Sequence, residues 1–295
     1  MASASCDVAV VGGGPAGAAT ALAAARAGLD VALLEGSSYD SPRPGETLAP
    51  AARSVLARLG LGTAVDAAST PALGMESAWG AAELTARPSI FDPYGDGRHV
   101  DRPRFDELLA GAAAGAGARV LRGARVVACA RECDGWRLTL ANGAPPGRAG
   151  APAAVGGGSE IDGGPLRRLG ARAAVGGGRE GDGGPPWGLG ARAVIDATGR
   201  NAALARRLGA RRRVRDHLVG IAVEYRGTPH AGGPTLVEAV RDGWWYAVPL
   251  PPDRFVAVLV TDADICRAGR YPDPARWTAA LEATRQVGAR VRGRA

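Results

Sequence analysis

The stretch Asp7–Gly17, which reads DVAVVGGGPAG, decides the fold of the N-terminal part of this chain. Its apolar half predicts a buried strand, and the alanine-rich residues that follow predict a helix that stops at Gly28. A second apolar run, Val31–Leu34, predicts another strand, which is closed by Glu35. Strand, G-x-G-x-x-G, helix, strand and acid is the order of a dinucleotide-binding unit, in which the acid accepts hydrogen bonds from ribose hydroxyls.

Each residue of the glycine-rich turn has a physical role in this interpretation. Gly12 allows the tight turn, Gly14 leaves the backbone open to a pyrophosphate, and Gly17 lets the helix pack closely against the strand. The helix begins at Pro15-Ala16, so its free N–H groups and positive dipole end face the phosphates.

Composition and length favour a cytoplasmic protein of about two domains. The chain has 295 residues, of which 46% are hydrophobic. It has no apolar run near the ~20 residues that span a bilayer, and it lacks the basic region and cleavage site of a signal peptide. We therefore expect no membrane association.

All 36 basic residues are arginine, so no lysine can act as a base or form a Schiff base. The net charge of +7 is spread along the chain, apart from a cluster at residues 211–215 and a basic tail at residues 290–294. We interpret it as solvated surface charge and expect no nucleic-acid partner. The four cysteines form no C-x-x-C and do not cluster with the three histidines, so we expect neither a metal site nor a disulfide framework.

After Glu35 a loop ends in Arg43-Pro-Gly-Glu46, and a helix is expected with Val55, Leu56 and Leu59 on one face. Residues 62–98 are expected to be irregular. A further helix is expected from near Arg102, burying Phe105, Leu108 and Leu109. Short strands are expected over residues 119–121, 125–129 and 136–140.

Residues 154–193 form a tandem repeat with a period of twenty. The motif Ala-Val-Gly-Gly-Gly begins at Ala154 and again at Ala174, and Leu-Gly-Ala-Arg begins at Leu169 and again at Leu189. Two copies are too few for a solenoid, and each has little apolar surface to offset the entropy of ordering its glycines. We expect a flexible surface insertion rather than a binding element.

The C-terminal third predicts an antiparallel sheet. A strand over residues 193–196 leads into a turn, and further strands are expected at 218–225, 235–240, 244–248 and 255–261. Asp-Gly at 242–243 and Pro-Pro-Asp at 251–253 are turn signals between them, and a helix from about Pro274 runs into the basic tail.

These features together resemble the FAD-dependent monooxygenase superfamily of the para-hydroxybenzoate hydroxylase type. The resemblance covers about residues 6–262 and rests on the Gly12–Glu35 fingerprint, the Arg102-led helix, and Asp196-Ala-Thr-Gly199. It implies an α/β fold with a Rossmann-like discontinuous FAD-binding domain plus an antiparallel β-sheet substrate domain. It also implies FAD as cofactor and allows NAD(P)H as a transient reductant.

We expect the FAD-binding domain in residues 1–61 and 99–210, with the Gly-rich insertion at 145–191. The substrate domain is expected in residues 62–98 and 211–295. The resemblance implies these cofactor-binding residues: Gly12, Gly14, Pro15, Ala16, Gly17, Glu35, Arg43, Glu46, Arg102, Asp196 and Gly199.

Within that superfamily, two stretches look like the sequences of one branch: Arg43-Pro-Gly-Glu46-Thr-Leu and Trp244-Trp-Tyr246-Ala-Val248-Pro. That branch holds flavin-dependent halogenases, prenyl reductases and flavoproteins that mature tryptophan-derived quinone cofactors. The second stretch is similar to the halogenase W-x-W-x-I-P motif, with Tyr246 and Val248 replacing Trp and Ile; core packing explains a Trp-Trp-Tyr strand equally well. Halogenases of this branch depend on a lysine, so the lysine-free chain argues against that reaction.

The family's third FAD motif, a Gly-Asp pair, has no counterpart after Asp262. We therefore expect a chain shortened relative to the family, with the 255–260 strand partly uncovered and a partner chain able to complete the fold.

The first functional hypothesis is an FAD-dependent oxidoreductase, monooxygenase-like, that passes electrons to oxygen or to an organic acceptor. The alternatives are a flavin-dependent reductase, a maturase acting on a protein partner, and a non-catalytic nucleotide-binding remnant. The substrate is a small molecule in the first two cases and a protein in the third. No general acid or base can be named, and the lone His99 is interpreted as structural.

Overall fold

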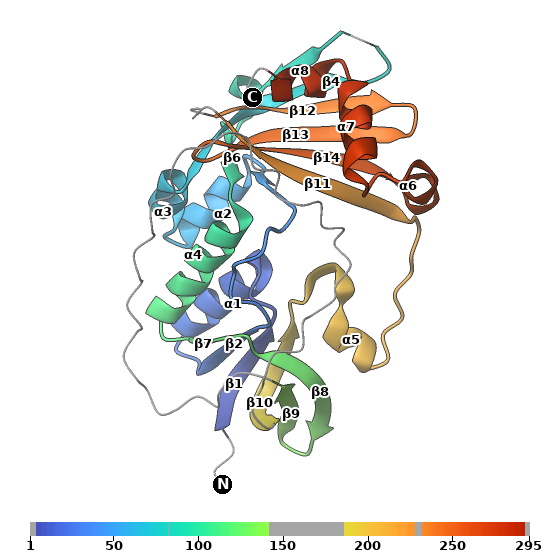
Figure 1. Cartoon of the computed structure of the whole chain (residues 1–295). Coiled ribbons are helices and arrows are strands. Elements are labelled where there is room, and N and C mark those ends of the chain that lie inside the picture. Colours follow the sequence, from blue (N-terminus) through green and yellow to red (C-terminus); the bar gives the residue numbers. More distant parts are fainter. Residues whose placement is uncertain (1–3, 82, 142–185, 228–231, 293–295) are drawn as a thin grey trace. The chain divides into compact units, whose positions relative to one another are not determined.

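The computed structural model describes residues 4–81, 83–141, 186–227 and 232–292 (Figure 1). Its contacts divide the chain into two compact units. The first unit holds residues 4–42, 103–141 and 186–213 of the described chain, and the second holds residues 43–102 and 214–292. The sequence-based boundary at residue 61 thus differs from the contact-based boundary at Pro42, because β3 (Thr47–Leu48) pairs with β6 (Gly97–Val100) in the second unit.

The first unit is built on a six-stranded sheet in the order β7-β2-β1-β10-β9-β8. The first four of these strands run parallel, and β9 and β8 run antiparallel at one edge. The strands are β1 (Ala4–Val11), β2 (Val31–Glu35), β7 (Arg119–Arg122), β8 (Arg125–Glu132), β9 (Gly135–Ala141) and β10 (Trp187–Asp196). The helices assigned wholly or mainly to this unit are α1 (Pro15–Arg26), α4 (Arg102–Gly115), the 3-10 turn η2 (Gly199–Asn201) and α5 (Ala203–Arg207).

The predicted strand–helix–strand order of the N-terminus is confirmed. β2 is buried along its whole length, as expected for a central parallel strand. α1 buries a face of small residues, among them Ala18, Ala21 and Leu22, and contacts both β1 and β2. Small side chains let this helix lie close to the sheet, which fixes where its N-terminus meets the end of β1.

The predicted C-terminal end of the insertion, at residue 191, is wrong. Most of the repeat lies outside the described residues, but its last residues belong to β10, which begins at Trp187 rather than at residue 193. Leu189 is fully buried and is aligned with Ala4 of β1 on one side and Leu138 of β9 on the other. The Leu-Gly-Ala-Arg of the second copy is therefore central sheet, not surface loop.

The second unit contains an eight-stranded sheet in the order β11-β14-β13-β12-β4-β6-β3, with β5 paired to β4. All of its neighbouring pairs are antiparallel except β12 with β4. The remaining strands are β4 (Ser69–Ala78), β5 (Thr85–Pro88), β11 (Leu218–Arg226), β12 (Gly233–Val240), β13 (Gly243–Leu250) and β14 (Arg254–Asp262). Its helices are α2 (Ala52–Arg58), α3 (Gly62–Ala67), η1 (Ser89–Phe91), α6 (Ala263–Gly269), α7 (Pro274–Glu282) and α8 (Gln286–Arg292).

The four C-terminal strands and their hairpin turns are confirmed. The expectation of an irregular segment at 62–98 is wrong, because α3, β4, β5 and β6 all lie within it. β4 lies between β12 and β6 in this sheet, although Pro71 and Gly74 interrupt its pattern. The expected face of α2 is also only partly right, since Leu56 is buried and Val55 is exposed.

One face of this sheet is covered by helices. Trp277 of α7 packs against Trp245 of β13 with ring centroids 4.8 Å apart, and Val287 of α8 is fully buried in the same cluster. Phe255 and Leu259 of β14 are buried there, so the expectation of an uncovered 255–260 strand is wrong. The residues predicted as a basic tail are partly helical.

Arg290 lies in α8 and pairs with Glu76 of β4. Among the described residues, no helix combines the length and the apolar character needed to cross a membrane.

Candidate cofactor site and a buried polar cluster

The two glycine-bearing turns of the first unit meet where β1 and β10 end. Val11 is aligned with Asp196, and the N–H of Ala197 donates to the carbonyl of Val11 at 2.8 Å. Gly12 has φ +106°, and a Cβ at this position would overlap the carbonyl oxygen of Ala197. Gly12 is therefore required both by its backbone conformation and by the turn that follows β10.

The N-terminus of α1 is open. Gly14 is the N-cap, no side chain caps the helix, and Pro15 occupies the first turn. A Cβ at Gly14 would meet nothing within 4 Å, whereas a Cβ at Gly17 would overlap the carbonyl oxygen of Gly12. Gly17 thus serves the packing of helix on turn, and Gly14 leaves free space in front of an uncapped helix end, where an anion is favoured.

Glu35 organises the glycine-rich turn from the end of β2. It is buried, and its Oε2 accepts a hydrogen bond from the N–H of Gly13 at 2.6 Å. Its Oε1 accepts from the N–H of Ser37 at 3.0 Å and from the Ser37 hydroxyl at 2.6 Å. The carboxylate therefore holds the turn in place, and its role toward a ribose stays a prediction.

Tyr39 is a residue that the sequence did not single out. Its hydroxyl donates to the carbonyl of Gly13 at 2.9 Å, and the guanidinium of Arg122 lies over its ring, 5.2 Å from the centroid. The residue is buried with φ +63°. A tyrosine in a Ser- and Pro-rich loop gives no pattern that predicts this contact.

Asp196 organises the second turn. Its Oδ1 accepts from the N–H and the hydroxyl of Thr198, and its Oδ2 accepts from the N–H of Ala205 in α5 at 2.7 Å. Partial burial acts to raise the pKa of this carboxyl, but these hydrogen bonds outweigh it and lower the pKa below its ordinary value. Asp196 is thus a positioning residue for the turn that holds Ala197 against Gly12.

In the second unit, the loop Arg43–Glu46 is held by Arg102. The Arg102 guanidinium donates to the carbonyl of Pro44, and Gly45, with φ +107°, leaves the space that this guanidinium occupies. The N–H of Gly45 donates to Oε2 of Glu46 at 2.9 Å, and Glu46 is buried.

Glu46 adjoins a cluster of buried and partly buried polar side chains on one face of the second sheet. Tyr246 is hydrogen-bonded to Glu46, and its hydroxyl lies 3.0 Å from Oγ1 of Thr47. Oγ1 of Thr47 also lies 3.1 Å from Nδ1 of His99 and 3.5 Å from Oγ1 of Thr235. Core packing thus accounts for Trp245, whereas Tyr246 points to the opposite, polar face; the resemblance of this strand to the halogenase motif stays a prediction.

Burial dominates the electrostatics of this cluster. It raises the pKa of the Glu46 carboxyl, and the N–H of Gly45, the charge of Arg102 and the hydrogen bond with Tyr246 oppose it without cancelling it. Burial, and then the nearby Glu46, also raise the pKa of the Tyr246 phenol far above its ordinary value. His99 is fully buried and bonded at both ring nitrogens, as expected for a structural histidine.

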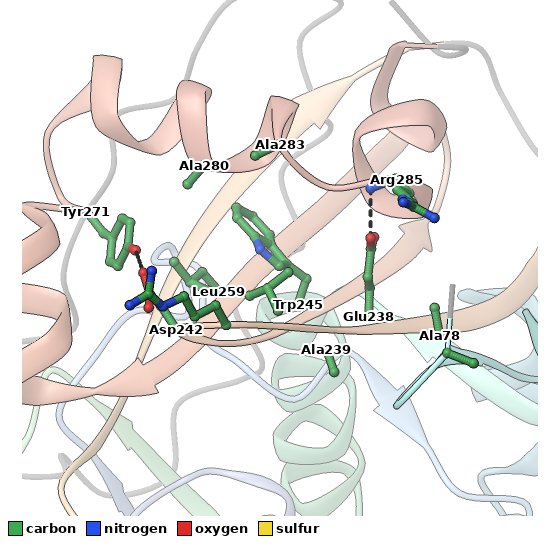
Figure 2. A pocket seen from close by; sticks show the side chains of 13 residues that line it. Ala78, Glu238, Ala239, Asp242, Trp245, Leu259, Tyr271, Ala280, Ala283 and Arg285 are labelled. Atoms are coloured by element: carbon green, nitrogen blue, oxygen red, sulfur yellow. Dashed lines mark hydrogen bonds between the residues drawn. The ribbon is translucent and has the colours of Figure 1, made fainter. Parts of the chain in front are cut away.

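The opposite face of the second sheet carries a cavity of about 460 Å³ under α7 (Figure 2). Trp245 and Leu259 line it, and its carboxylates are engaged in the fold. Glu238 accepts from the N–H groups of Arg285, Gln286 and Val287, and Asp242 accepts from the Tyr271 hydroxyl at 2.8 Å. None of the sequence-predicted site residues lines this cavity.

The structure distributes the predicted cofactor residues between the two units. The first unit brings together the two turns, with Gly12, Gly14, Pro15, Ala16, Gly17, Glu35, Asp196 and Gly199. The second unit holds Arg43, Glu46 and Arg102 around one loop. The roles of all eleven residues toward a cofactor stay predictions.

Comparison with known protein families identifies the cofactor. Residues 5–145 match the FAD binding domain family. This match confirms FAD, the cofactor that the resemblance to the FAD-dependent monooxygenase superfamily implied.

Two curated proteins illustrate the relationship. The chain is 25% identical over 291 residues to the putative FAD-dependent oxidoreductase LodB of Marinomonas mediterranea, which covers 97% of this chain and 68% of that protein. It is 37% identical over 147 residues to the menaquinone reductase of Mycobacterium tuberculosis, which covers 48% of this chain and 36% of that protein.

Solved structures share the fold. The myxobacterial chondrochloren halogenase CndH matches with a TM-score of 0.73 and 22% identity, over 95% of this chain and 58% of that one. The peptidyl tryptophan dihydroxylase QhpG, essential for tryptophylquinone cofactor biogenesis, matches with a TM-score of 0.59 and 23% identity, over 96% of this chain and 54% of that one. Two proteins from the branch that the sequence resembles thus share the fold of this chain, and the chain spans little more than half of either structure.

Proposed function

On the premise that this chain carries the FAD-binding domain of the FAD-dependent oxidoreductases, we propose that it is a monooxygenase-like flavoenzyme. When bound and reduced, FAD supplies the electrons that pass to oxygen or to an organic acceptor. The observation that carries the proposal is the junction of Gly12 with Ala197 beside the uncapped N-terminus of α1.

The residues of the first unit fit the dinucleotide. The space in front of Gly14 and the uncapped helix end suit a pyrophosphate, because free N–H groups and the positive dipole end stabilise its charge. Glu35 stands at the end of the second strand of the βαβ unit, where its carboxylate can accept from ribose hydroxyls. Asp196 and Gly199 shape the adjoining turn.

Three further residues proposed to bind the cofactor, Arg43, Glu46 and Arg102, belong to the second unit. Arg102 carries a positive charge suited to a cofactor phosphate or ring oxygen, and it also fixes the loop that contains Arg43 and Glu46. NAD(P)H is the proposed transient reductant. The lysine-free chain does not support lysine-dependent halogenation.

The experiment measures the oxidation of the reductant and the consumption of oxygen in the same sample. Purified protein reconstituted with FAD is supplied with NADH or NADPH, and reductant oxidation and oxygen consumption are recorded in air and under argon. We expect FAD-dependent oxidation of the reductant coupled to oxygen uptake. A protein that binds FAD and is never reduced by either nucleotide or by dithionite would overturn the proposal.

A reductase is the second candidate, favoured by the 37% identity with a menaquinone reductase. It predicts that a soluble naphthoquinone restores turnover under argon. A maturase is the third candidate, favoured by the fold shared with a peptidyl tryptophan dihydroxylase. It predicts oxygen insertion into a tryptophan-containing polypeptide, which mass spectrometry would detect. If the protein does not bind FAD at all, the non-catalytic remnant is the only one of these hypotheses that remains.

A further inference from the structure

Arg254, at the start of β14, is the centre of a largely enclosed ion-pair cluster in the second unit. Its guanidinium donates to Oδ2 of Asp101 at 2.6 Å and to Oε1 of Glu224 at 3.0 Å. The side chains of Arg254, Asp101 and Glu224 are only 15%, 11% and 14% exposed. The carbonyl of Pro251 accepts two further hydrogen bonds from the same guanidinium, at 3.2 and 3.3 Å. A planar guanidinium that donates in several directions holds its partners in a fixed geometry.

Asp101 lies between two residues that contact the loop of the second unit. On one side, the N–H of Val100 donates to the carbonyl of Glu46 at 2.7 Å. On the other side, the guanidinium of Arg102 donates to the carbonyl of Pro44. Because these three residues are consecutive in the chain, a displacement of Asp101 moves both contacts with the loop.

We propose that Arg254 is a positioning residue for cofactor binding: through Asp101 it holds Arg102, and the loop that Arg102 fixes, in the arrangement that binds FAD. The inference deepens the proposed function and rests on it for the role of Arg102 toward FAD. Neither Arg254 nor Asp101 is among the sequence-predicted cofactor residues, and Arg254 lies outside residues 5–145, which match the FAD binding domain family.

The second carboxylate of the cluster offers a matched control. Glu224 pairs with the same guanidinium and has nearly the same exposed fraction as Asp101. It belongs to β11, which pairs with β14, and not to the segment that contacts the loop. Loss of the Glu224 carboxylate therefore removes a comparable ion pair of Arg254 and leaves the contact between Arg254 and Asp101 in place.

The first test measures amide hydrogen exchange in the full chain without cofactor. Peptides covering residues 97–102 include the N–H of Val100 that is bonded to Glu46. Asp101→Ala should speed the exchange of this N–H by roughly tenfold, the factor that corresponds to the loss of one hydrogen bond to a charged group. Glu224→Ala should exchange as the wild type does.

Two conservative variants show whether the effect depends on the contact with Arg254. Asp101→Asn keeps an oxygen that can accept from the guanidinium and should restore slow exchange. Arg254→Lys keeps the charge but loses the planar arrangement of donors, so it should exchange as fast as Asp101→Ala. Exchange at the wild-type rate in Asp101→Ala or in Arg254→Lys, or equal acceleration in Glu224→Ala, would overturn the proposal.

The second test is calorimetric titration with FAD, arranged as a double-mutant cycle of Asp101→Ala and Arg102→Met. Asp101→Ala alone should weaken FAD binding by roughly tenfold. It should add little to the loss caused by Arg102→Met, because it acts through Arg102. Glu224→Ala should bind FAD as the wild type does.

The cycle separates the failure of this proposal from the failure of the proposed function. An Arg102→Met variant that binds FAD as the wild type does would overturn the assignment of Arg102 to the cofactor, and the present proposal with it. If Arg102→Met weakens binding, three results would overturn the present proposal alone. They are unchanged affinity in Asp101→Ala, fully additive losses in the double variant, and an equal loss in Glu224→Ala.

Discussion

Gly12 faces the carbonyl group of Ala197 so closely that the Cβ of any side chain at residue 12 would overlap that oxygen. The contact joins the turn after β1 to the turn after β10, two segments far apart in the sequence whose strands are paired in parallel. The glycine-rich turn is therefore shaped by the second turn as well as by its own backbone, and the two turns lie together at the carboxyl ends of β1 and β10.

Gly12→Ala should destabilise the first unit. The variant forces a side chain into a positive φ, which costs roughly 1–2 kcal/mol, and the overlap with Ala197 adds to this cost. The free energy of unfolding from urea denaturation measures the loss. Gly111→Ala is the control, because Gly111 lies in α4 with nothing within 4 Å of its Cβ position; it should be neutral or stabilising by up to about 1 kcal/mol. Equal stability of the two variants would contradict the account of Gly12.

Asp196→Ala should weaken the second turn in a pH-dependent way. Loss of the carboxylate removes acceptors for Thr198 and Ala205, a change similar to the loss of a helix cap, which costs about 1 kcal/mol. Since the folded pKa of Asp196 is lowered, its contribution is present above the ordinary value of 3.8 and is lost as pH falls through the folded pKa. The difference between variant and wild type in urea unfolding should shrink from pH 6 to pH 3. A difference in the free energy of unfolding that grows toward low pH would contradict this account of Asp196.

A matched pair of substitutions, one in each copy of the repeat, tests whether the two copies differ in structure. Leu189→Ala removes a fully buried side chain of β10 and should cost about 2–5 kcal/mol. Leu169→Ala changes the equivalent position of the first copy, which lies outside the described residues and is predicted to be a surface insertion; it should cost less than about 0.5 kcal/mol. Thermal unfolding measures both. A large loss for Leu169→Ala would mean that the first copy packs on the protein.

The raised pKa of Glu46 predicts a contribution to the free energy of unfolding that falls as pH rises. Its pKa is raised in the folded protein, so between the ordinary value of 4.5 and the folded value the native state binds more protons than the unfolded state. Its contribution is complete below pH 4.5 and is lost as pH rises through the folded pKa, with a slope of at most ~1.4 kcal/mol per pH unit. Glu46→Gln should remove this component from the free energy of unfolding. Glu107→Gln, at an exposed residue paired with Arg122, should leave it in place. A wild-type slope unchanged in Glu46→Gln would refute the assignment.

The parts of the fold that sequence could predict are those encoded by local pattern. The βαβ unit has an apolar run on each side of a glycine-rich turn. An Asp-Gly turn separates β12 from β13, and a Pro-Pro-Asp turn separates β13 from β14. Such signals depend only on neighbours in the chain, and the structure has these elements close to where they were expected.

The parts that sequence could not predict depend on distant partners. β4 contains Pro71 and Gly74 and becomes a strand because β12 and β6 pair with it. β10 begins six residues before its apolar run, because β9 supplies an antiparallel neighbour. The cluster of Glu46, Thr47 and Tyr246 joins residues about 200 positions apart, so no local pattern indicates that they share a hydrogen-bond chain.

The measurement that tests the account most directly is calorimetric titration of the apoprotein with FAD, comparing wild type with Gly14→Val and Gly111→Val. Both glycines have nothing within 4 Å of a Cβ and no positive φ, so both variants should fold. The account predicts that Gly14→Val weakens FAD binding by about a hundred-fold or more, because hydrogen bonds to the pyrophosphate charge contribute ~1.5–3 kcal/mol each, while Gly111→Val binds as the wild type does. Unchanged FAD affinity in a folded Gly14→Val variant would contradict it.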